Sequence, residues 1–456
     1  PRSRGLGDVY KRQDKGKIQI IEKIDYMVDK ILCDIDLDGV LEFLVPYNDT
    51  IVAYKYNSSQ KCFEIMWSTW LGDFYELVVG SMQKNKTISR TIRCPPACAD
   101  LDGDGRIEIA VGAGHTLFFL SSDGRPLRRI DIEYDIRNIT ILDINSDGTL
   151  DVVMRLNVSN KIAFADMYSY GGEAEYLSLT KPLIGSIRIT RFLYYEYTEK
   201  PICMILYTTS ESIIVRYQNH TRDSSGYFNK TVDKSETVTL AEGAGVSIVV
   251  DAVSGNFTYE KSKFSDAEFL TILSNDTVYI AGVPHRVLGA VNPVRIEATI
   301  DGARNITLLP LVADFDDDGL DEAAFLLRMN EEEYTIVFLG QNVTNASLAE
   351  LRSRTVNLRS PPSYWLVTMT DGSLDTPDIL LLLENGSLLK LNICDDMIVV
   401  DSIGCVSPNM SYMLVGDIDG DSESELLVVS NSSIYAYDMG LWGCWGYIYH
   451  DCGNTN

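Results

Sequence analysis

The sequence predicts an all-β protein built from about eight units of four antiparallel strands, and three observations lead to this fold class. An acidic loop of fixed spacing occurs five times along the chain. Each loop precedes a short apolar run such as LEFLV or IEIAV, followed by a turn and a second run of strand length. The loops begin at residues 34, 100, 143, 314 and 417, and their separations of 66, 43, 171 and 103 residues include large gaps near multiples of a unit of about 50 to 60 residues.

Five segments carry the repeat in full. They are CDIDLDGVLEFLV from Cys33, ADLDGDGRIEIAV from Ala99, LDINSDGTLDVVM from Leu142, ADFDDDGLDEAAF from Ala313 and GDIDGDSESELLV from Gly416. Degenerate units that start at Phe192, Val249 and Val367 fill the gaps and lose most of the acids. A unit of four short strands cannot bury its own faces, so neighbouring units stack radially in a ring. We therefore predict one β-propeller domain over residues 14–456, with about eight blades and seven as the alternative.

The two ends of the chain receive separate interpretations. Residues 1–13, PRSRGLGDVYKRQ, resemble a translated sequencing adapter and are set aside from the fold as non-native. The segment KIQIIEKI from Lys17 is expected to pair with the last blade and close the ring. The C-terminal end of the domain is a cysteine-containing tail. No run of 18 apolar residues occurs, so no membrane span is expected in this segment.

The spacing of the acids predicts calcium. Numbered from the first acid, side-chain oxygens occupy positions 1, 3, 5 and 9, and position 6 is Gly in four of the five loops. Calcium binds about six to eight oxygen ligands, and Gly allows the tight turn that brings them together. Position 7 is expected to add a main-chain carbonyl. The predicted ligands of up to five ions are Asp34, Asp36, Asp38, Val40 and Glu42 in loop 1; Asp100, Asp102, Asp104, Arg106 and Glu108 in loop 2; Asp143, Asn145, Asp147, Thr149 and Asp151 in loop 3; Asp314, Asp316, Asp318, Leu320 and Glu322 in loop 4; and Asp417, Asp419, Asp421, Glu423 and Glu425 in loop 5.

Two loops depart from the pattern. Asn145 leaves loop 3 with one charge fewer, so its binding is expected to be weaker. Ser422 stands in loop 5 where Gly is expected, which predicts a strained turn or lower occupancy. An EF-hand is excluded because it needs a Glu at position 12 and flanking helices, whereas the residues at position 12 here are apolar.

The overall charge fits this prediction. The net charge is −26, and nineteen acids at positions 1, 3, 5 and 9 of the loops repel one another, which calcium would relieve. Five bound ions would change the net charge to about −16. Nucleic acid is excluded as a partner, because phosphate binding needs a basic stripe that this sequence lacks.

Glycosylation sequons indicate an exported protein. Fifteen of the 23 asparagines stand in Asn-x-Ser/Thr, where chance would supply roughly three. Most of them lie beside turn residues or at strand ends, where a glycan can point into water. The predicted sites are Asn48, Asn57, Asn85, Asn138, Asn157, Asn219, Asn229, Asn256, Asn275, Asn305, Asn342, Asn345, Asn385, Asn409 and Asn431.

Three cysteine pairs at short separations are candidate disulfides, with buried thiols as the alternative. A zinc site is disfavoured, because the CPPAC segment has no second cysteine or histidine pair to complete it. The odd count of nine leaves one cysteine free or bonded to another chain. The candidate pairs are Cys94 with Cys98, Cys394 with Cys405, and Cys444 with Cys452.

The five loops resemble the FG-GAP or VCBS repeat family, whose best known member is the integrin α-chain propeller. The resemblance covers roughly residues 25–445 and is loose in the degenerate units. In that family the loop between the first two strands of a blade binds calcium, which agrees with the ligands predicted above. The resemblance implies an interaction platform outside the cell.

The expected function is therefore a calcium-stabilised, glycosylated binding or structural module at the cell surface. An adhesin, an appendage or a surface-layer component that binds a protein, a glycan or copies of itself fits this expectation. The alternative is a polysaccharide lyase or a lectin on the same fold, but no GxSxG, HExxH or basic catalytic loop supports an enzyme. The tryptophans are the residues that could stack on sugars. The competing interpretation is that they pack between blades. They are Trp67, Trp70, Trp365, Trp442 and Trp445.

Overall fold

The structure is a computed structural model, and the regular elements that it describes are β-strands. It describes residues 31–60, 62–79, 82–88, 90–142, 150–158, 161–165, 174–178, 188–192, 202–208, 212–222, 228–239, 248–255, 264–274, 277–284, 295–299, 305–308, 310–315, 319–341, 348–368, 377–394, 397–406, 412–421, 424–429, 434–438 and 446–447. The strand expected from Lys17 and the predicted Cys444–Cys452 bridge lie outside these residues.

The described strands form eight four-stranded antiparallel sheets, each from one continuous stretch of chain. We number the sheets 1 to 8 in sequence order. Sheet 1 contains β1 (Ile31–Cys33), β2 (Glu42–Tyr47), β3 (Thr50–Asn57) and β4 (Cys62–Trp70). Sheet 2 contains β7 (Ala97–Ala99), β8 (Glu108–Ala113), β9 (Thr116–Ser121) and β10 (Pro126–Asp131). Sheet 3 contains β11 (Ile136–Leu142), β12 (Asp151–Leu156), β13 (Lys161–Ala165) and β14 (Glu175–Ser178).

The remaining sheets repeat the same order. Sheet 4 contains β15 (Arg188–Phe192), β16 (Ile202–Thr208), β17 (Ser212–Arg222) and β18 (Phe228–Thr239). Sheet 5 contains β19 (Ile248–Gly255), β20 (Phe264–Leu273), β21 (Thr277–Pro284) and β22 (Arg295–Thr299). Sheet 6 contains β23 (Leu311–Ala313), β24 (Glu322–Arg328), β25 (Glu333–Gln341) and β26 (Leu348–Asn357). Sheet 7 contains β27 (Pro362–Thr368), β28 (Asp378–Leu383), β29 (Ser387–Cys394) and β30 (Met397–Cys405), and sheet 8 contains β31 (Tyr412–Gly416), β32 (Glu425–Val429), β33 (Ile434–Asp438) and β34 (Gly446–Tyr447).

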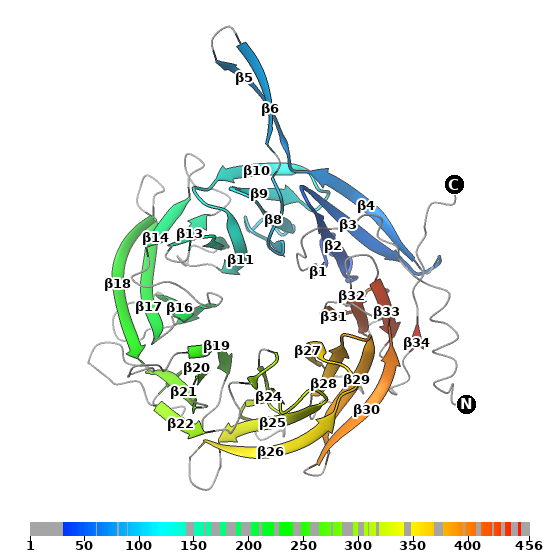
Figure 1. The fold of residues 1–456 in the computed structure, drawn as a ribbon. Helices are drawn as coiled ribbons and strands as arrows, with labels where there is room; N and C mark the ends of the chain where they lie inside the picture. The colour runs from blue at the N-terminus through cyan, green and yellow to red at the C-terminus, as the bar shows by residue number, and fades with distance from the viewer. Residues whose placement is uncertain are drawn as a thin grey trace.

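The sheets follow one another around a ring, with the first strand of each sheet on the inside (Figure 1). First strands of neighbouring sheets contact each other, as β23 does β27 and β27 does β31. The ring closes where β1 contacts β31, which brings the first and last sheets together. This radial arrangement of four-stranded antiparallel sheets is a β-propeller.

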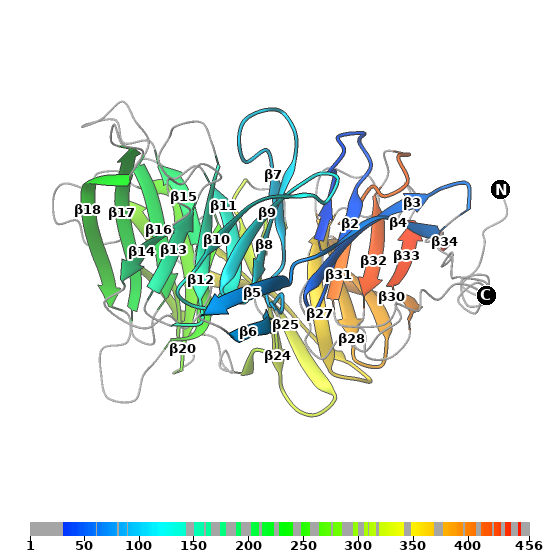
Figure 2. The ribbon, with the colours of Figure 1, turned by 90° about the horizontal axis from the view of Figure 1, so that it is seen from above.

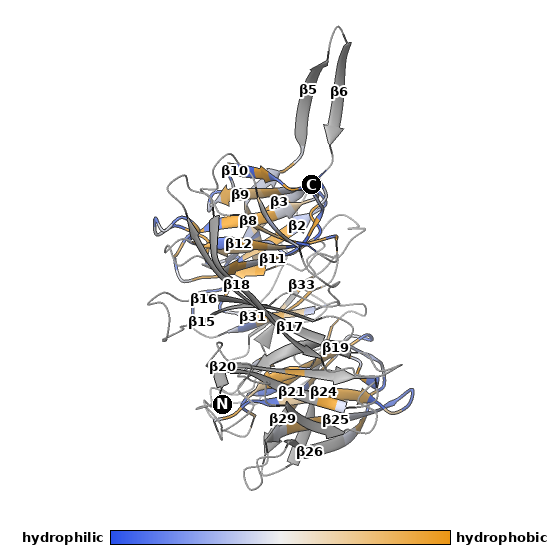
Figure 3. Ribbon diagram, turned by 90° about the vertical axis from the view of Figure 1, so that its left-hand side faces the viewer, coloured by the Kyte–Doolittle hydropathy of each residue, from blue (hydrophilic) through white to orange (hydrophobic). Residues whose placement is uncertain are grey.

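The apolar cores lie between neighbouring sheets. Phe43 and Val45 of β2 belong to a cluster shared with sheet 8, whereas Leu44 between them packs with residues of sheet 2. Because successive side chains of a strand point to opposite faces, a strand covered on both faces is apolar throughout. Figure 3 shows this hydrophobic character along β8 and β24. It explains why the runs after the acidic loops are continuous.

A two-stranded hairpin interrupts the repeat between sheets 1 and 2. Strands β5 (Asp73–Val79) and β6 (Met82–Ile88) pair with each other and join none of the four-stranded sheets. The hairpin projects outward from the ring (Figure 1). This insertion accounts for the long separation of 66 residues between the first two loops.

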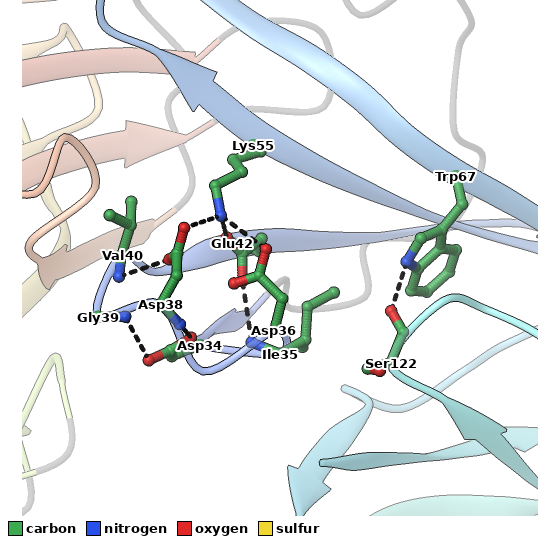
Figure 4. Close-up of polar contacts among 10 residues, drawn as sticks. All are labelled: Asp34, Ile35, Asp36, Asp38, Gly39, Val40, Glu42, Lys55, Trp67 and Ser122. Carbon is green, nitrogen blue, oxygen red and sulfur yellow. Dashed lines mark hydrogen bonds and ion pairs between the residues drawn. The ribbon is translucent and has the colours of Figure 1, made fainter. Parts of the chain in front are cut away.

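A tryptophan of sheet 1 contacts a turn of sheet 2 beside this insertion. Trp67 Nε1 donates a hydrogen bond to the carbonyl oxygen of Ser122 in the β9–β10 turn at 2.8 Å (Figure 4). Gly124 in the same turn has a φ of +80°, and a Cβ there would lie 2.6 Å from the Trp67 ring. The turn therefore needs glycine both for its backbone conformation and for its contact with the indole.

Candidate functional site

The acidic loops join the first strand of a sheet to the second. Because antiparallel strands alternate in direction, these loops lie at one face of the ring and the turns between second and third strands lie at the other (Figure 2). Loops 1 and 2 are described in full, and loops 4 and 5 in part. Predicted ligands outside the described residues are Asp143, Asn145, Asp147, Thr149, Asp316, Asp318 and Glu423.

The acid at position 9 begins the second strand and holds the loop closed. In loop 1 the Ile35 amide donates to Glu42 Oε2 at 2.9 Å, and in loop 5 the Ile418 amide donates to Glu425 Oε2 at 2.8 Å. Loops 2 and 4 repeat this contact through Glu108 and Glu322. One carboxylate oxygen of the position-9 acid thus ties the loop to the strand, and in loops 2 and 5 the other oxygen takes no part in this contact.

The acid at position 1 accepts hydrogen bonds from amides later in the loop. Asp34 Oδ2 accepts from the Gly39 amide and Asp100 Oδ2 from the Gly105 amide, each at 2.9 Å. Both glycines stand at position 6 and have a positive φ, 91° for Gly39 and 85° for Gly105. The predicted need for glycine at position 6 is confirmed in these two loops.

Position 4 has a positive φ as well, which the sequence did not predict. Gly103 and Gly420 have φ of 77° and 81°, and Leu37 at the same position of loop 1 has a φ of 60°. A left-handed conformation costs a non-glycine residue roughly 1–2 kcal/mol. Loop 1 therefore keeps the shared backbone shape at the expense of strain at Leu37.

Among the described residues, three loops bring carboxylates close together. In loops 1, 2 and 5 the acids at positions 1, 3 and 9 each place one oxygen within 4.8 Å of the others. They are Asp34, Asp36 and Glu42; Asp100, Asp102 and Glu108; and Asp417, Asp419 and Glu425. Arg106 and Val40 at position 7 donate their amides to Asp104 and Asp38, and the role of their carbonyls as ligands stays a prediction.

The position-9 acid of loop 5, Glu425, lies in an electrostatically unfavourable environment. Glu425 is 1% exposed, and its Oε1 atom is buried without a hydrogen-bond partner among the described residues. Burial, followed by the negative charges of Asp419, Asp421 and Asp417, raises the pKa of Glu425 to about 8. Burial also raises the pKa of Glu108 in loop 2. A cation bound by these oxygens would offset the cost of burying the carboxylates and would reduce the repulsion between them.

Loop 1 differs because a lysine reaches into it. Lys55 Nζ from β3 lies 2.7 Å from Asp36 Oδ2, 2.6 Å from Asp38 Oδ2 and 2.9 Å from Glu42 Oε1 (Figure 4). Partial burial alone would lower the pKa of Lys55, but these three carboxylates raise it above its ordinary value. The hydrogen bond from Lys55 lowers the pKa of Asp38.

Buried acids head the second strand in six sheets. Asp151 of β12, 0% exposed, is the one predicted ligand of loop 3 among the described residues. The sixth acid, Asp378 at the start of β28, was missed because its loop lacks the repeated acids. Its Oδ2 atom lies 2.8 Å from Lys390 Nζ, so this sheet also uses a lysine from its third strand.

Six sequon asparagines have a described side chain, and none of the six is buried. Asn48, Asn157 and Asn385 are exposed in turns between second and third strands, at the face opposite the acidic loops. Asn305 is also exposed, and Asn57 and Asn138 are half-buried. Strands contain Asn85, Asn219 and Asn229. Outside the described residues lie Asn256, Asn275, Asn342, Asn345, Asn409 and Asn431.

The cysteine predictions need correction. Cys98 bonds to Cys33 across sheets 2 and 1, so the predicted Cys94–Cys98 bridge is wrong, and Cys94 is a buried thiol. Cys405 keeps its thiol, so the Cys394–Cys405 bridge is wrong too. The physical reason is register: Cys394 pairs with Met397 and Cys405 with Ser387, at opposite ends of one hairpin. Cys62 is also disulfide-bonded, which the sequence did not indicate.

Two of the three described tryptophans, Trp67 and Trp365, pack between sheets. Trp365 is 5% exposed in the core between sheets 6 and 7, and Trp67 bonds to the turn of sheet 2. Trp70 is 41% exposed and donates to Asp49 Oδ2 at 3.0 Å. Trp442 and Trp445 lie outside the described residues. For Trp365 and Trp67 the packing interpretation is confirmed.

Comparison with known proteins gives likenesses of structure only. No family model matches the chain, and no curated protein matches it. BBS1N, solved in complex with ARL6DN, is 11% identical with a TM-score of 0.42, over 92% of this chain and 96% of that chain. BamB from Moraxella catarrhalis is 11% identical with a TM-score of 0.45, over 89% of this chain and 98% of that chain. The protein is therefore classed by its own sheet topology, as a β-propeller with acidic loops at one face.

Proposed function

We propose that this chain is an eight-bladed, calcium-stabilised and N-glycosylated β-propeller that acts outside the cell as a binding or structural module. Each of the eight sheets is one blade, which favours eight blades over the alternative of seven. No helix in the described part of the chain is long and apolar enough to span a membrane.

The observation that carries the proposal is the Glu425 Oε1 atom. It is buried and has no hydrogen-bond partner among the described residues, and the Glu425 carboxylate places one oxygen within 4.8 Å of oxygens of Asp417 and Asp419. A buried, unpaired carboxylate oxygen is costly unless a cation binds it. Hard oxygen donors converging in a tight loop suit calcium, which accepts variable coordination. In loop 1 the corresponding oxygen already contacts a cation, the ammonium of Lys55.

Loop 2 supplies a second calcium site of the same kind. Its position-9 acid, Glu108, is 4% exposed and lies with oxygens of Asp100 and Asp102 in one cluster. The position-9 acids of loops 3 and 4, Asp151 and Glu322, begin their strands as Glu108 does. These loops complete the set of proposed sites.

Two features support an exported location. The Cys33–Cys98 disulfide persists in oxidising compartments and is rare in the cytosol. Exposed sequons at Asn48, Asn157 and Asn385 would place glycans at the face opposite the acidic loops. Around sheets 1, 3 and 7, the face with the acidic loops then carries fewer of these glycans than the opposite face. It is the face that we propose for binding a surface protein, a glycan or another copy of the chain.

Calcium counting by native mass spectrometry tests the proposal. The wild type is expected to bind several ions, and Glu425→Gln is expected to bind one fewer. Asp123→Asn is a matched control, because Asp123 is a half-exposed acid in a β9–β10 turn outside the clusters. Equal ion counts in all three proteins, or no bound ion, would contradict the proposal.

A further inference from the structure

The cation position of loop 1 is filled by the chain itself. An ammonium group has three N–H donors, and Lys55 Nζ has three carboxylate oxygens within 2.9 Å, from Asp36, Asp38 and Glu42. Two of these contacts are hydrogen bonds, to Asp36 and Asp38, and the contact with Glu42 Oε1 is an ion pair. The Glu42 oxygen that contacts Lys55 corresponds to the Glu425 oxygen that is buried without a hydrogen-bond partner among the described residues.

Loop 1 differs from loops 2 and 5 in the residue that stands opposite the position-9 acid in the sheet register. Tyr54 pairs with Phe43, so Lys55 stands opposite Glu42 in the sheet register. The corresponding residue opposite Glu108 is Ser121, and the residue opposite Glu425 is Asp438. Of these three residues only Lys55 brings a positive charge into its loop, because Ser and Asp carry none.

Sheet 7 also brings a third-strand lysine to a buried acid, but from another register position, because Lys390 pairs with Leu380 rather than with Asp378. Asp378 begins β28 as Glu42 begins β2, and Lys390 from the third strand lies 2.8 Å from its carboxylate. The Lys390 side chain is 14% exposed and that of Asp378 is 5% exposed, so this is a largely buried ion pair. A lysine on the third strand thus neutralises the buried acid in two sheets.

We propose that loop 1 holds the ammonium of Lys55 in place of a metal ion, so that loops 2 and 5 bind calcium while loop 1 does not. A calcium ion binds its oxygens at about 2.3–2.6 Å, so it would need the place that Nζ occupies among these three carboxylates. Lys55 is tethered, which spares loop 1 the cost of capturing a free ion. The negative charges of loop 1 then stay compensated when calcium is scarce. This loop belongs to sheet 1, which contacts sheet 8 where the ring closes.

The inference rests on the proposed calcium sites for its contrast between loops, and a reciprocal exchange tests it. Lys55→Ser, which installs the residue of loop 2, is expected to bind one calcium ion more than the wild type. Ser121→Lys, which installs the residue of loop 1, is expected to bind one fewer. Lys161→Ser is the control, because Lys161 is a third-strand lysine that pairs with Glu133 rather than with a loop. Its ion count should equal that of the wild type.

Amine labelling of the wild type gives a second readout that needs no variant. With an acylating reagent, Lys55 should react slowly in calcium and in EGTA alike. Unchanged ion counts in Lys55→Ser, or faster labelling of Lys55 when calcium is added, would overturn the inference. A wild type without calcium would contradict the proposed function instead. In that case a gain of one ion by Lys55→Ser, or slow labelling of Lys55, would still support the inference.

Discussion

Glu42 and Glu425 occupy the same place at the start of a second strand, but their free oxygens meet different environments. Both Oε1 atoms are buried without a hydrogen bond, but Glu42 Oε1 forms an ion pair with Lys55 Nζ at 2.9 Å, whereas Glu425 Oε1 has no ion pair among the described residues. The repeated loop therefore has one geometry and two modes of charge neutralisation. Stability should depend on calcium and on pH in loop 5, and on Lys55 in loop 1.

The pH dependence of the calcium-free protein should come largely from Glu425. Its pKa in the folded protein, about 8, lies above its ordinary value of 4.5, so the folded state favours the protonated acid. The stability from this group is complete below pH 4.5 and is lost as the pH rises through about 8. Urea unfolding in EGTA across this range measures it.

Glu425→Gln should flatten that profile and unfold at higher urea than the wild type in EGTA at the alkaline end. Calcium should stabilise the variant less than the wild type, because one ligand is gone. Glu384→Gln, at an exposed position, serves as the control and should leave the profile unchanged. An unaltered profile in Glu425→Gln would show that another group titrates.

Leu37 should be replaceable by glycine with a gain in stability. Leu37 has a φ of 60° and is 55% exposed, so its loss removes strain and little packing. Leu37→Gly should stabilise the protein by roughly 1 kcal/mol, and Leu37→Val should destabilise it, because branched side chains tolerate this conformation poorly. Chemical denaturation of both variants checks the order, and a reversed order would be incompatible with strain at this position.

The Cys33–Cys98 disulfide should contribute strongly to stability. It joins residues 65 apart and fastens sheet 1 to sheet 2. Cys33→Ser with Cys98→Ser should cost about 4 kcal/mol through the freedom gained by the unfolded chain. Peptide mapping without reduction should find the two peptides linked. Cys94→Ser should leave that linkage intact, and a Cys94–Cys98 peptide would refute the assignment.

Removing Lys390 should destabilise sheet 7. Lys390→Met leaves the Asp378 carboxylate buried beside an apolar side chain, which should cost about 3 kcal/mol. Adding Asp378→Asn should recover much of that loss, since the amide carries no charge. Unfolding free energies of the two single variants and the double variant test the coupling, and additive losses would argue against it.

The sequence predicted the repeated part of the fold well. Strands begin at the position-9 acids Glu42, Glu108, Glu322 and Glu425, because an acidic turn followed by an apolar run is a local signal. The β5–β6 hairpin was missed, since an insertion between sheets breaks the period without changing the composition.

The contacts across the sheets could not be predicted. Lys55 lies 19 residues from Asp36, and only the register of β2 with β3 places its ammonium in the loop. Cys33 and Cys98 likewise stand on first strands of neighbouring sheets, so short sequence separation misled the pairing. Asp378 was not predicted because its loop lacks the repeated acids, although the second strand of the sheet still begins with a buried acid.

The central claim is that calcium stabilises this propeller through its acidic loops, and thermal unfolding of the full chain in calcium and in EGTA tests it most directly. Metal counting on the same samples ties any shift to bound ions. We predict several bound ions and a midpoint that rises with calcium concentration, as expected when a ligand binds the folded state. An unchanged midpoint with no bound metal would show that the acidic loops are solvated turns.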